Sequence, residues 1–312
     1  MAAGVVLIMN RDIRNGFIYS ILGAMTYGMN PLFALPMYNK GFGAEDVLFY
    51  RYLLSCVILA GLVLWRKKSF RLPGKLVFPA IAGGLLCGSS SASLYLSYNE
   101  MDAGIASTLL FVYPVMVAVM MTAFFKEKLS WQTTLGLLGA LAGIAILYRG
   151  GDGATLDTYG VILTMISAFT YAVYMVMLKT TDLGKLPADV LIFYVMAGGI
   201  PIFLVYSLFC DGIQLPVTAS AWSCALALAL FPTVISFLLM TLGIRYIGAT
   251  RASILGALEP VTAVVFGIMI YGEAFTFRLC LGTVVIIAAV TLVVALGDKK
   301  TNTQGEMICS TN

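Results

Sequence analysis

The sequence contains no histidine among its 312 residues, and only 11% of its residues are charged. Histidine is the usual proton-transfer group near neutral pH and a common metal ligand, so its absence excludes many enzymes and metal sites. The six cysteines, at positions 56, 87, 210, 224, 280 and 309, show neither paired metal-site spacing nor a secreted disulfide pattern. We therefore expect no catalytic residues, no metal and no other cofactor.

A cluster of positive charge is also missing. The formal net charge of +4 comes from lysines and arginines that are divided among many short segments, with no basic patch interleaved with aromatic residues. Proteins that bind nucleic acid gather such residues on one face. We expect no nucleic-acid partner.

Apolar residues are abundant: hydrophobic residues make up 60% of the chain, and the mean hydropathy is +0.95. A helix needs roughly 20 mostly apolar residues to cross a bilayer. Ten stretches meet this need, at 14–37, 45–65, 76–98, 102–125, 130–148, 158–178, 188–209, 220–244, 248–271 and 275–296. The sequence predicts an all-α polytopic membrane protein with ten transmembrane helices, in contact with the lipid bilayer over most of its length.

The distribution of positive charge predicts the orientation of these helices, because lysine and arginine are retained on the cytoplasmic side. With the N-terminus inside, fifteen of the 19 lysines and arginines fall in inside segments and three in outside segments, while Arg51 lies within the second helix. Both termini are therefore predicted to be cytoplasmic. The first residues lack the order of a cleaved signal peptide, so the first spanning helix is expected to supply targeting.

Two halves of the chain share a register. Ala106, Ser107, Pro114, Glu127 and Gly136 recur 146 residues later as Ala252, Ser253, Pro260, Glu273 and Gly282. The first and sixth predicted helices match at an offset of 144, and the second and seventh at 143. Five helices separate each pair, so the second copy is predicted to lie upside down relative to the first, as in secondary carriers with a midplane site.

This repeat divides the chain into predicted parts around a central cavity. They are a cytoplasmic N-terminus (1–13), a first five-helix repeat (14–149), an outside linker (150–157), a second five-helix repeat (158–297) and a disordered cytoplasmic tail (298–312).

The stretch Glu259-Pro260 is the most unusual within an apolar span. An ionised carboxylate near the bilayer centre costs about 2.5–3.5 kcal/mol on insertion scales. Pro260 lacks an N–H and leaves the carbonyl of Gly256 without its helical partner. Glu259 is a candidate for substrate binding and proton coupling, although a carboxyl that only satisfies the freed backbone is the alternative. Pro114 and Pro260 are candidate hinges.

Aromatic and amide groups are candidate cavity residues. Tyr27 and Asn30 lie three residues apart on the first helix, and Tyr171 and Tyr174 lie three apart on the sixth, so each pair shares a helix face. Tyr113 occupies the place of Glu259 in the first copy. These groups could hold a flat, partly polar substrate by stacking and hydrogen bonds. The alternative is that the tyrosines belong to the aromatic belts of the membrane interfaces.

Other charged residues have simpler explanations. Arg51 could snorkel to the outer surface or pair with Glu45 or Asp46. The alternative is a cation at the cavity mouth that attracts anionic groups of a substrate. Glu127 and Glu273 are expected to cap the helices that follow them.

The ordered set of motifs resembles the EamA-like members of the drug/metabolite transporter superfamily. It consists of Arg51-Tyr52, Pro114 followed by Glu127, Arg251-Ala252-Ser253, Glu259-Pro260 and Gly272-Glu273, and the match runs from about 14 to 296. The resemblance implies a bacterial-type inner-membrane carrier with a central cavity that exports metabolites or toxic compounds.

The expected function is therefore a secondary carrier that moves a small amino-acid-like or drug-like metabolite by alternating access, most often outward. The expected partners are this solute, the lipid bilayer and protons, and the expected state is a monomer or homodimer. An importer or facilitator of the same fold is the first alternative. A membrane-embedded enzyme is the second, but it would need a nucleophile with a base, paired acids or metal ligands.

Overall fold

The computed structural model describes residues 2–100, 106, 109–129, 131–147, 157–209, 212–271, 277, 281–289 and 292. Within these residues the regular secondary structure is entirely helical. The predicted tail, 298–312, and most of the predicted linker, 150–157, lie outside the described residues.

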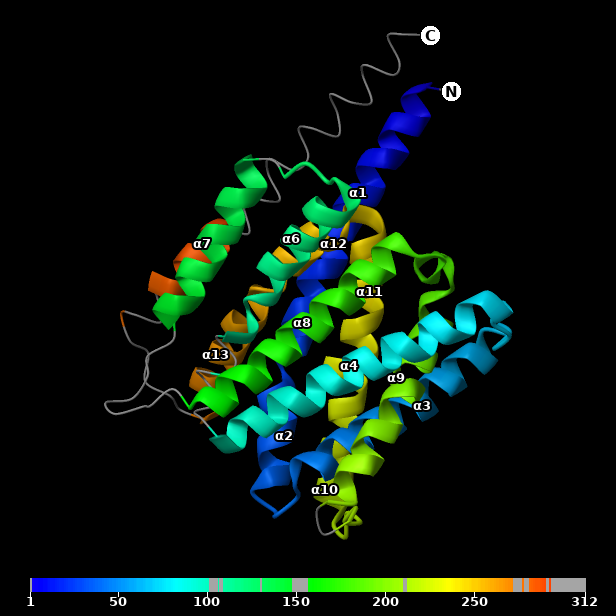
Figure 1. Ribbon diagram of the computed structural model, residues 1–312, viewed down its shortest axis with the longest axis vertical. Helices are drawn as coiled ribbons and strands as arrows, with labels where there is room; N and C mark the ends of the chain where they lie inside the picture. The colour runs from blue at the N-terminus through cyan, green and yellow to red at the C-terminus, as the bar shows by residue number, and fades with distance from the viewer. Residues whose placement is uncertain are drawn as a thin grey trace.

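The helices follow the predicted spans, with several subdivisions (Figure 1). The first half contains α1 (Ala2–Tyr27), α2 (Asn30–Tyr38), α3 (Ala44–Trp65), α4 (Gly74–Glu100), α6 (Tyr113–Phe125) and α7 (Trp131–Leu147). The second half contains α8 (Thr158–Thr180), η1 (Asp182–Lys185), α9 (Ala188–Ser207), α10 (Ala219–Ala229), η2 (Leu230–Ile235), α11 (Ser236–Ile247), α12 (Ala249–Leu255) and α13 (Leu258–Tyr271). Residues 281–289 are also helical.

Five of these helices are long and apolar enough to cross a membrane. They are Ala44–Trp65, Gly74–Ser97, Thr158–Thr180, Ala188–Ser207 and Ala219–Ile247, the last of which joins α10, η2 and α11. The other predicted spans are represented by shorter or divided helices in the described part of the chain.

The first predicted span, 14–37, is divided, and its prediction as one continuous helix is wrong. The α1 helix ends at Tyr27 and α2 begins at Asn30, with Pro31 in its first turn. Pro31 has no N–H to donate to the carbonyl four residues earlier, at Tyr27. The chain therefore turns at Gly28 and Met29 before helical hydrogen bonding resumes.

The predicted interruptions near Pro114 and Pro260 are confirmed. Turns lie at 111–112, before α6, and at 256–257, between α12 and α13. The carbonyl of Gly256, expected to lack a partner, accepts a hydrogen bond of 2.9 Å from the backbone N–H of Glu259. The correction has a simple reason: a tighter turn of three residues replaces the four-residue bond that Pro260 cannot make.

Helices from the two halves interleave. The α4 helix packs against α8 and α9, while α1 packs against α11 and α3 against α9 (Figure 1). Glycines permit these approaches: an added Cβ on Gly84 would lie 2.6 Å from the Cα of Gly198. At one side of the molecule, α7 packs against residues 281–289 through Gly139 and Gly143. Small residues at helix crossings supply the close contact that apolar lipid does not drive.

The α3 and α9 helices run antiparallel and are fastened at both ends. Asp46, in the first turn of α3, accepts a 2.8 Å hydrogen bond from the backbone N–H of Gln214, which follows α9. Asp189, in the first turn of α9, accepts bonds of 2.6 and 2.9 Å from Lys68, which follows α3. We call these two contacts the Asp46 latch and the Asp189 latch.

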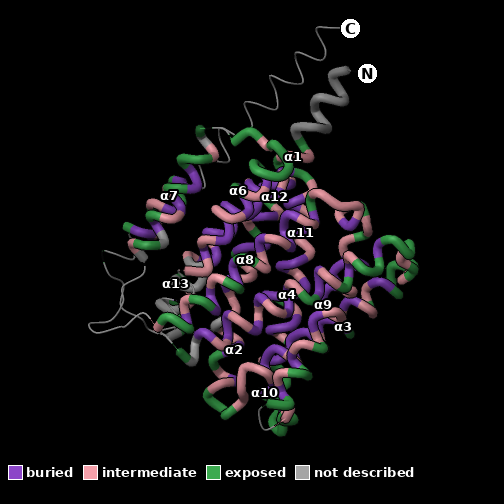
Figure 2. Tube along the Cα trace, in the orientation of Figure 1, coloured by how far each residue is buried: buried purple, intermediate pink, exposed green. Residues whose placement is uncertain are grey.

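The surface is apolar where a water-soluble protein would be polar. Buried residues concentrate along the middle of α4, α8, α9 and α11, and exposed residues lie at the periphery (Figure 2). The exposed residues include large apolar side chains such as Phe209, 83% exposed, and Trp65, 79% exposed. Such a surface suits contact with lipid.

Gly28 lies close to the backbone of another broken helix, which leads to the first prediction. A Cβ at residue 28 would lie 2.4 Å from the backbone carbonyl oxygen of Glu259. Because backbone must shift to relieve this clash, Gly28→Ala should destabilise the protein by about 1–3 kcal/mol. Thermal unfolding of the purified protein in detergent measures the effect.

Gly61→Ala is the matched control. Gly61 lies within α3 and has nothing within 4 Å of its added Cβ. Alanine is the better helix former by roughly 1 kcal/mol, so this variant should unfold at an equal or higher temperature. Equal stability of the Gly28→Ala variant and the wild type would contradict the close approach of α1 to α13.

Candidate functional site

A cavity lies where the broken helices meet. Its described lining comes from six elements, namely α1, α4, the segment before and at the start of α6, α8, α11 and α13, and consists of Tyr27, Cys87, Ser90, Ser91, Leu94, Tyr95, Leu110, Tyr113, Tyr171, Phe237 and Glu259. The cavity volume is about 20 Å³, which is room for about one water molecule. The cavity is therefore small in this conformation.

Glu259 is the acidic residue of the cavity wall. It lies in the first turn of α13 and is 9% exposed. Its side chain makes no hydrogen bond or ion pair within the described part of the chain. A helix N-terminus favours a nearby carboxylate, whereas removal from water disfavours the charge. The alternative that Glu259 satisfies the freed carbonyl of Gly256 with its side chain is wrong, because its backbone N–H does so.

Tyr113 connects the two interruptions. Its hydroxyl donates a 3.3 Å hydrogen bond to the carbonyl of Ser253 in α12. The same hydroxyl occupies the space beside Gly256, where an added Cβ would clash with it. The predicted meeting of the two proline-containing spans is thus confirmed, and Tyr113 is buried between them.

Four of the six predicted binding residues line the cavity: Tyr27, Tyr113, Tyr171 and Glu259. The rings of Tyr113 and Tyr171 pack edge to face, with centroids 5.0 Å apart. The other two, Asn30 and Tyr174, are not among the described lining residues.

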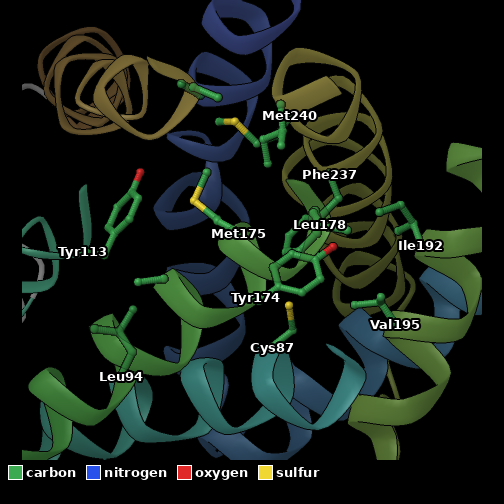
Figure 3. Packing of buried hydrophobic residues seen from close by; sticks show 14 of the residues in the cluster. Cys87, Leu94, Tyr113, Tyr174, Met175, Leu178, Ile192, Val195, Phe237 and Met240 are labelled. Atoms are coloured by element: carbon green, nitrogen blue, oxygen red, sulfur yellow. The ribbon is translucent and has the colours of Figure 1, made fainter. Parts of the chain in front are cut away.

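Tyr174 and Asn30 instead occupy neighbouring positions. The ring of Tyr174 stacks on that of Tyr171 with centroids 6.3 Å apart. Figure 3 shows the Cys87 sulfur directed toward the Tyr174 ring, so Tyr174 packs between α8 and α4. The Oδ1 atom of Asn30, at the start of α2, is buried without a hydrogen-bond partner among the described residues.

The α4 helix supplies more of the wall than the sequence indicated. Cys87, Ser90, Ser91 and Tyr95 line the cavity. A signal was present, because the serine-rich run that follows Gly88 is polar for a spanning helix. Ser90 also packs α4 against α8, through its hydrogen bonds to Ser167.

Arg51 is the largest departure from the predicted site. It is 1% exposed, so the snorkelling interpretation is wrong, whereas its place at the cavity mouth stays a prediction. It also makes no ion pair with Glu45 or Asp46 among the described residues. Its guanidinium carbon lies 5.3 Å from the centroid of the Tyr27 ring, which makes a cation–π contact.

Arg51 is drawn inward by the backbone of η2, a π-helical turn. Pro232 cannot donate to the carbonyl of Leu228, so the Thr233 hydroxyl donates to it instead, at 2.9 Å. Arg51 Nε then donates to the Thr233 hydroxyl oxygen at 2.7 Å, and Arg51 Nη2 reaches the Pro232 carbonyl at 3.4 Å. Pro232 thus interrupts the regular helical hydrogen bonding, and Arg51 from α3 donates hydrogen bonds at the interruption.

The site's chemistry is that of binding. It combines one acid, several phenols, small hydroxyls and a nearby guanidinium inside apolar helices. Where the structure describes the chain, no group of three or more acids and cysteines is placed to hold a metal ion. A few polar groups converging in an otherwise apolar pocket between helices are typical of a small-molecule site.

An apolar helix bundle built from broken helices around a small polar cavity defines a membrane transport protein. The sequence profile of the EamA-like transporter family matches the chain twice, at residues 14–149 and 158–295. The chain therefore belongs to the EamA-like transporter family.

Its relatives carry transporter names without a stated substrate. The chain is 25% identical to the uncharacterized transporter YdfC of Bacillus subtilis over 258 residues, covering 80% of this chain and 82% of the relative. It is 26% identical to the uncharacterized transporter YcbK of the same organism, covering 84% and 87%. A crystal structure with 15% sequence identity superimposes with a TM-score of 0.78 over 92% of this chain and 98% of that one, which shows a shared fold.

The Thr233 bridge gives the second prediction. Thr233→Val keeps the side-chain shape but removes the hydroxyl that joins Arg51 Nε to the Leu228 carbonyl. Two buried polar groups lose their partner, so the variant should be destabilised by about 1–3 kcal/mol. Thermal unfolding in detergent measures the loss.

Thr170→Val is the control, because the half-buried Thr170 hydroxyl bonds only carbonyls of its own helix. Its stability should change by less than about 0.5 kcal/mol. A loss in the Thr233→Val variant no larger than this control's would refute the bridge.

Proposed function

We propose that this protein is an inner-membrane secondary carrier that exports a small metabolite by alternating access between two inverted five-helix repeats. The observation that carries this proposal is the cavity at the junction of the broken helices, lined by Glu259 and tyrosines from both halves. Both termini are proposed to be cytoplasmic, and the carrier to act as a monomer or homodimer.

Matching contacts support the inverted repeat. The Ser236 hydroxyl donates to the carbonyl of Gly23 at 2.8 Å. Ser90 lies 146 residues before Ser236, and Ser167 lies 144 residues after Gly23, so each is the repeat counterpart of the other contact's residue. Ser90 donates to the Ser167 carbonyl at 3.0 Å. The same contact is therefore made by α11 on α1 and by α4 on α8.

The two latches oppose the separation of α3 and α9 at two separate ends. The Asp46 latch and the Asp189 latch join opposite ends of the antiparallel helices α3 and α9. Opening at one end leaves the contact at the other end in place. Such an arrangement suits a carrier that admits solute from one side at a time.

Proteoliposomes loaded with a labelled metabolite mixture test the proposal. A carrier moves intact solute across the bilayer, whereas a membrane-embedded enzyme converts it without net movement. Direction is read from parallel assays of efflux and uptake in vesicles of determined orientation. Conversion without movement would overturn the proposal, and movement only inward would favour the importer alternative.

Glu259→Gln tests proton coupling. Titration of Glu259 would make the transport rate depend on pH, and a glutamine at this position cannot titrate. The other titratable or charged groups around it are Cys87, Arg51 and tyrosines 27, 95, 113 and 171. We expect a flat pH profile between pH 5 and 8 for the variant, measured as initial efflux rate.

Glu100→Gln is the control for this experiment, because Glu100 is an exposed acid at the end of α4. It should keep the wild-type pH profile. A wild-type profile in the Glu259→Gln variant would eliminate Glu259 as the coupling group.

Pro260→Ala tests the hinge. Alanine restores the missing N–H and allows helical bonding to continue across the turn at 256–257. We expect a several-fold fall in kcat with little change in KM, because opening is slowed while the binding groups stay in place. Pro79→Ala, within the continuous helix α4, is the control, and an unchanged kcat for Pro260→Ala would show that this turn is not a hinge.

A further inference from the structure

The guanidinium of Arg51 has an unused nitrogen. Nε donates to Thr233 and Nη2 to the Pro232 carbonyl. Nη1 is buried without a hydrogen-bond partner among the described residues. The guanidinium has five N–H groups, two of them on Nη1, so η2 takes up only part of its donor capacity.

Arg51 also makes no direct ion pair among the described residues. The ion pairs of the described residues involve Asp182 and Asp189, not Arg51. Carbonyl, hydroxyl and aromatic groups surround it instead. Glu259 interacts with Arg51 through its charge, but no hydrogen bond joins the two side chains among the described residues. A buried cation without a hydrogen-bonded carboxylate is only partly compensated. Neutral hydrogen-bond donors would be enough to stabilise η2, so the contact with η2 does not require the positive charge of Arg51.

Tyr27 lies between the Arg51 guanidinium and the cavity. It lines the cavity, and its ring lies 5.3 Å from the guanidinium carbon of Arg51. Glu259, also in the wall, is close enough for its charge to interact with that of Arg51. Because the closed cavity holds about one water molecule, solute binding requires movement of the wall, of which Tyr27 is a part.

We propose that Arg51 Nη1 binds the carboxylate of the transported solute when Tyr27 moves aside, so that the solute is a small organic acid with a flat apolar body. This inference rests on the proposed carrier function and names its substrate class. The flat body follows from the faces of Tyr27, Tyr113 and Tyr171, which suit stacking. A single free nitrogen suits one oxygen of a monoanion, and Glu259 opposes a second negative charge.

Binding of a matched acid and amide tests the subsite. Phenylacetate and phenylacetamide have the same size and shape but differ in charge at pH 7. Apparent affinities come from the ligand-concentration dependence of thermal unfolding of the full-length protein in detergent. We expect wild type to bind phenylacetate about tenfold or more tightly than the amide, because a charge-assisted bond is made only with the acid.

Two variants of Arg51 test whether this residue causes the preference for the acid over the amide. Arg51→Gln should abolish the tenfold preference for the acid while it retains weak binding of the amide. Arg51→Lys should restore part of the preference, because it keeps the charge. Arg245→Gln is the matched control: Arg245 is half-buried in α11, also has an unpartnered Nε, and lies outside the described cavity lining. It should keep the wild-type preference.

Three results would overturn the inference. They are equal wild-type affinities for the acid and the amide, a preference that survives in Arg51→Gln, and stabilisation by chloride or inorganic phosphate as strong as that by phenylacetate. If Arg51→Gln does not fold, the wild-type comparison and Arg51→Lys still decide. Transport of the amide without preference for the acid would refute the subsite alone, and tight acid binding without transport would refute the carrier alone.

Discussion

Every backbone carbonyl within hydrocarbon needs a hydrogen-bond donor, and this constraint organises the molecule. Prolines 31, 114, 232 and 260 each remove a donor from an apolar span. At Pro31, Pro114 and Pro260 the chain turns within the four residues before the proline. At Pro232 the helix continues through a π-helical turn, and Thr233 supplies the missing donor. These departures from regular helix are thus local changes in hydrogen bonding that compensate for the missing N–H groups.

These local changes allow different helices to approach one another closely. Two of the turns contain a glycine, which has no side chain, so another part of the chain can approach closely, as Glu259 approaches Gly28 and Tyr113 approaches Gly256. Polar backbone and polar side chains then gather around the cavity. The cavity follows from this gathering, because the helices cannot pack as evenly around turns as around regular helix. Positioning of Glu259 in the first turn of α13 is one result.

Much of this arrangement could be predicted from the sequence. The shared register predicted interruptions near Pro114 and Pro260 and a cavity position for Tyr113, and spacing along the helices predicted that Tyr27 and Tyr171 would reach the cavity. The environment of Arg51 could not be predicted, because its partners in η2 lie about 180 residues away and depend on the packing of α3 against α10. The division of the first span was missed because Pro31 was counted as part of one continuous helix.

The two latches differ in chemistry, and this difference bears on how the molecule opens. Asp189 bonds the charged Lys68 and, at 3.4 Å, Arg66, whereas Asp46 bonds the neutral backbone N–H groups of Gly43 and Gln214. Opening the Asp189 latch separates opposite charges, while opening the Asp46 latch exchanges neutral donors for water. Salt screens the first contact more than the second. A change in ionic strength therefore alters the Asp189 latch more than the Asp46 latch, so that in the proposed carrier the two ends of the α3–α9 pair would not open with equal ease.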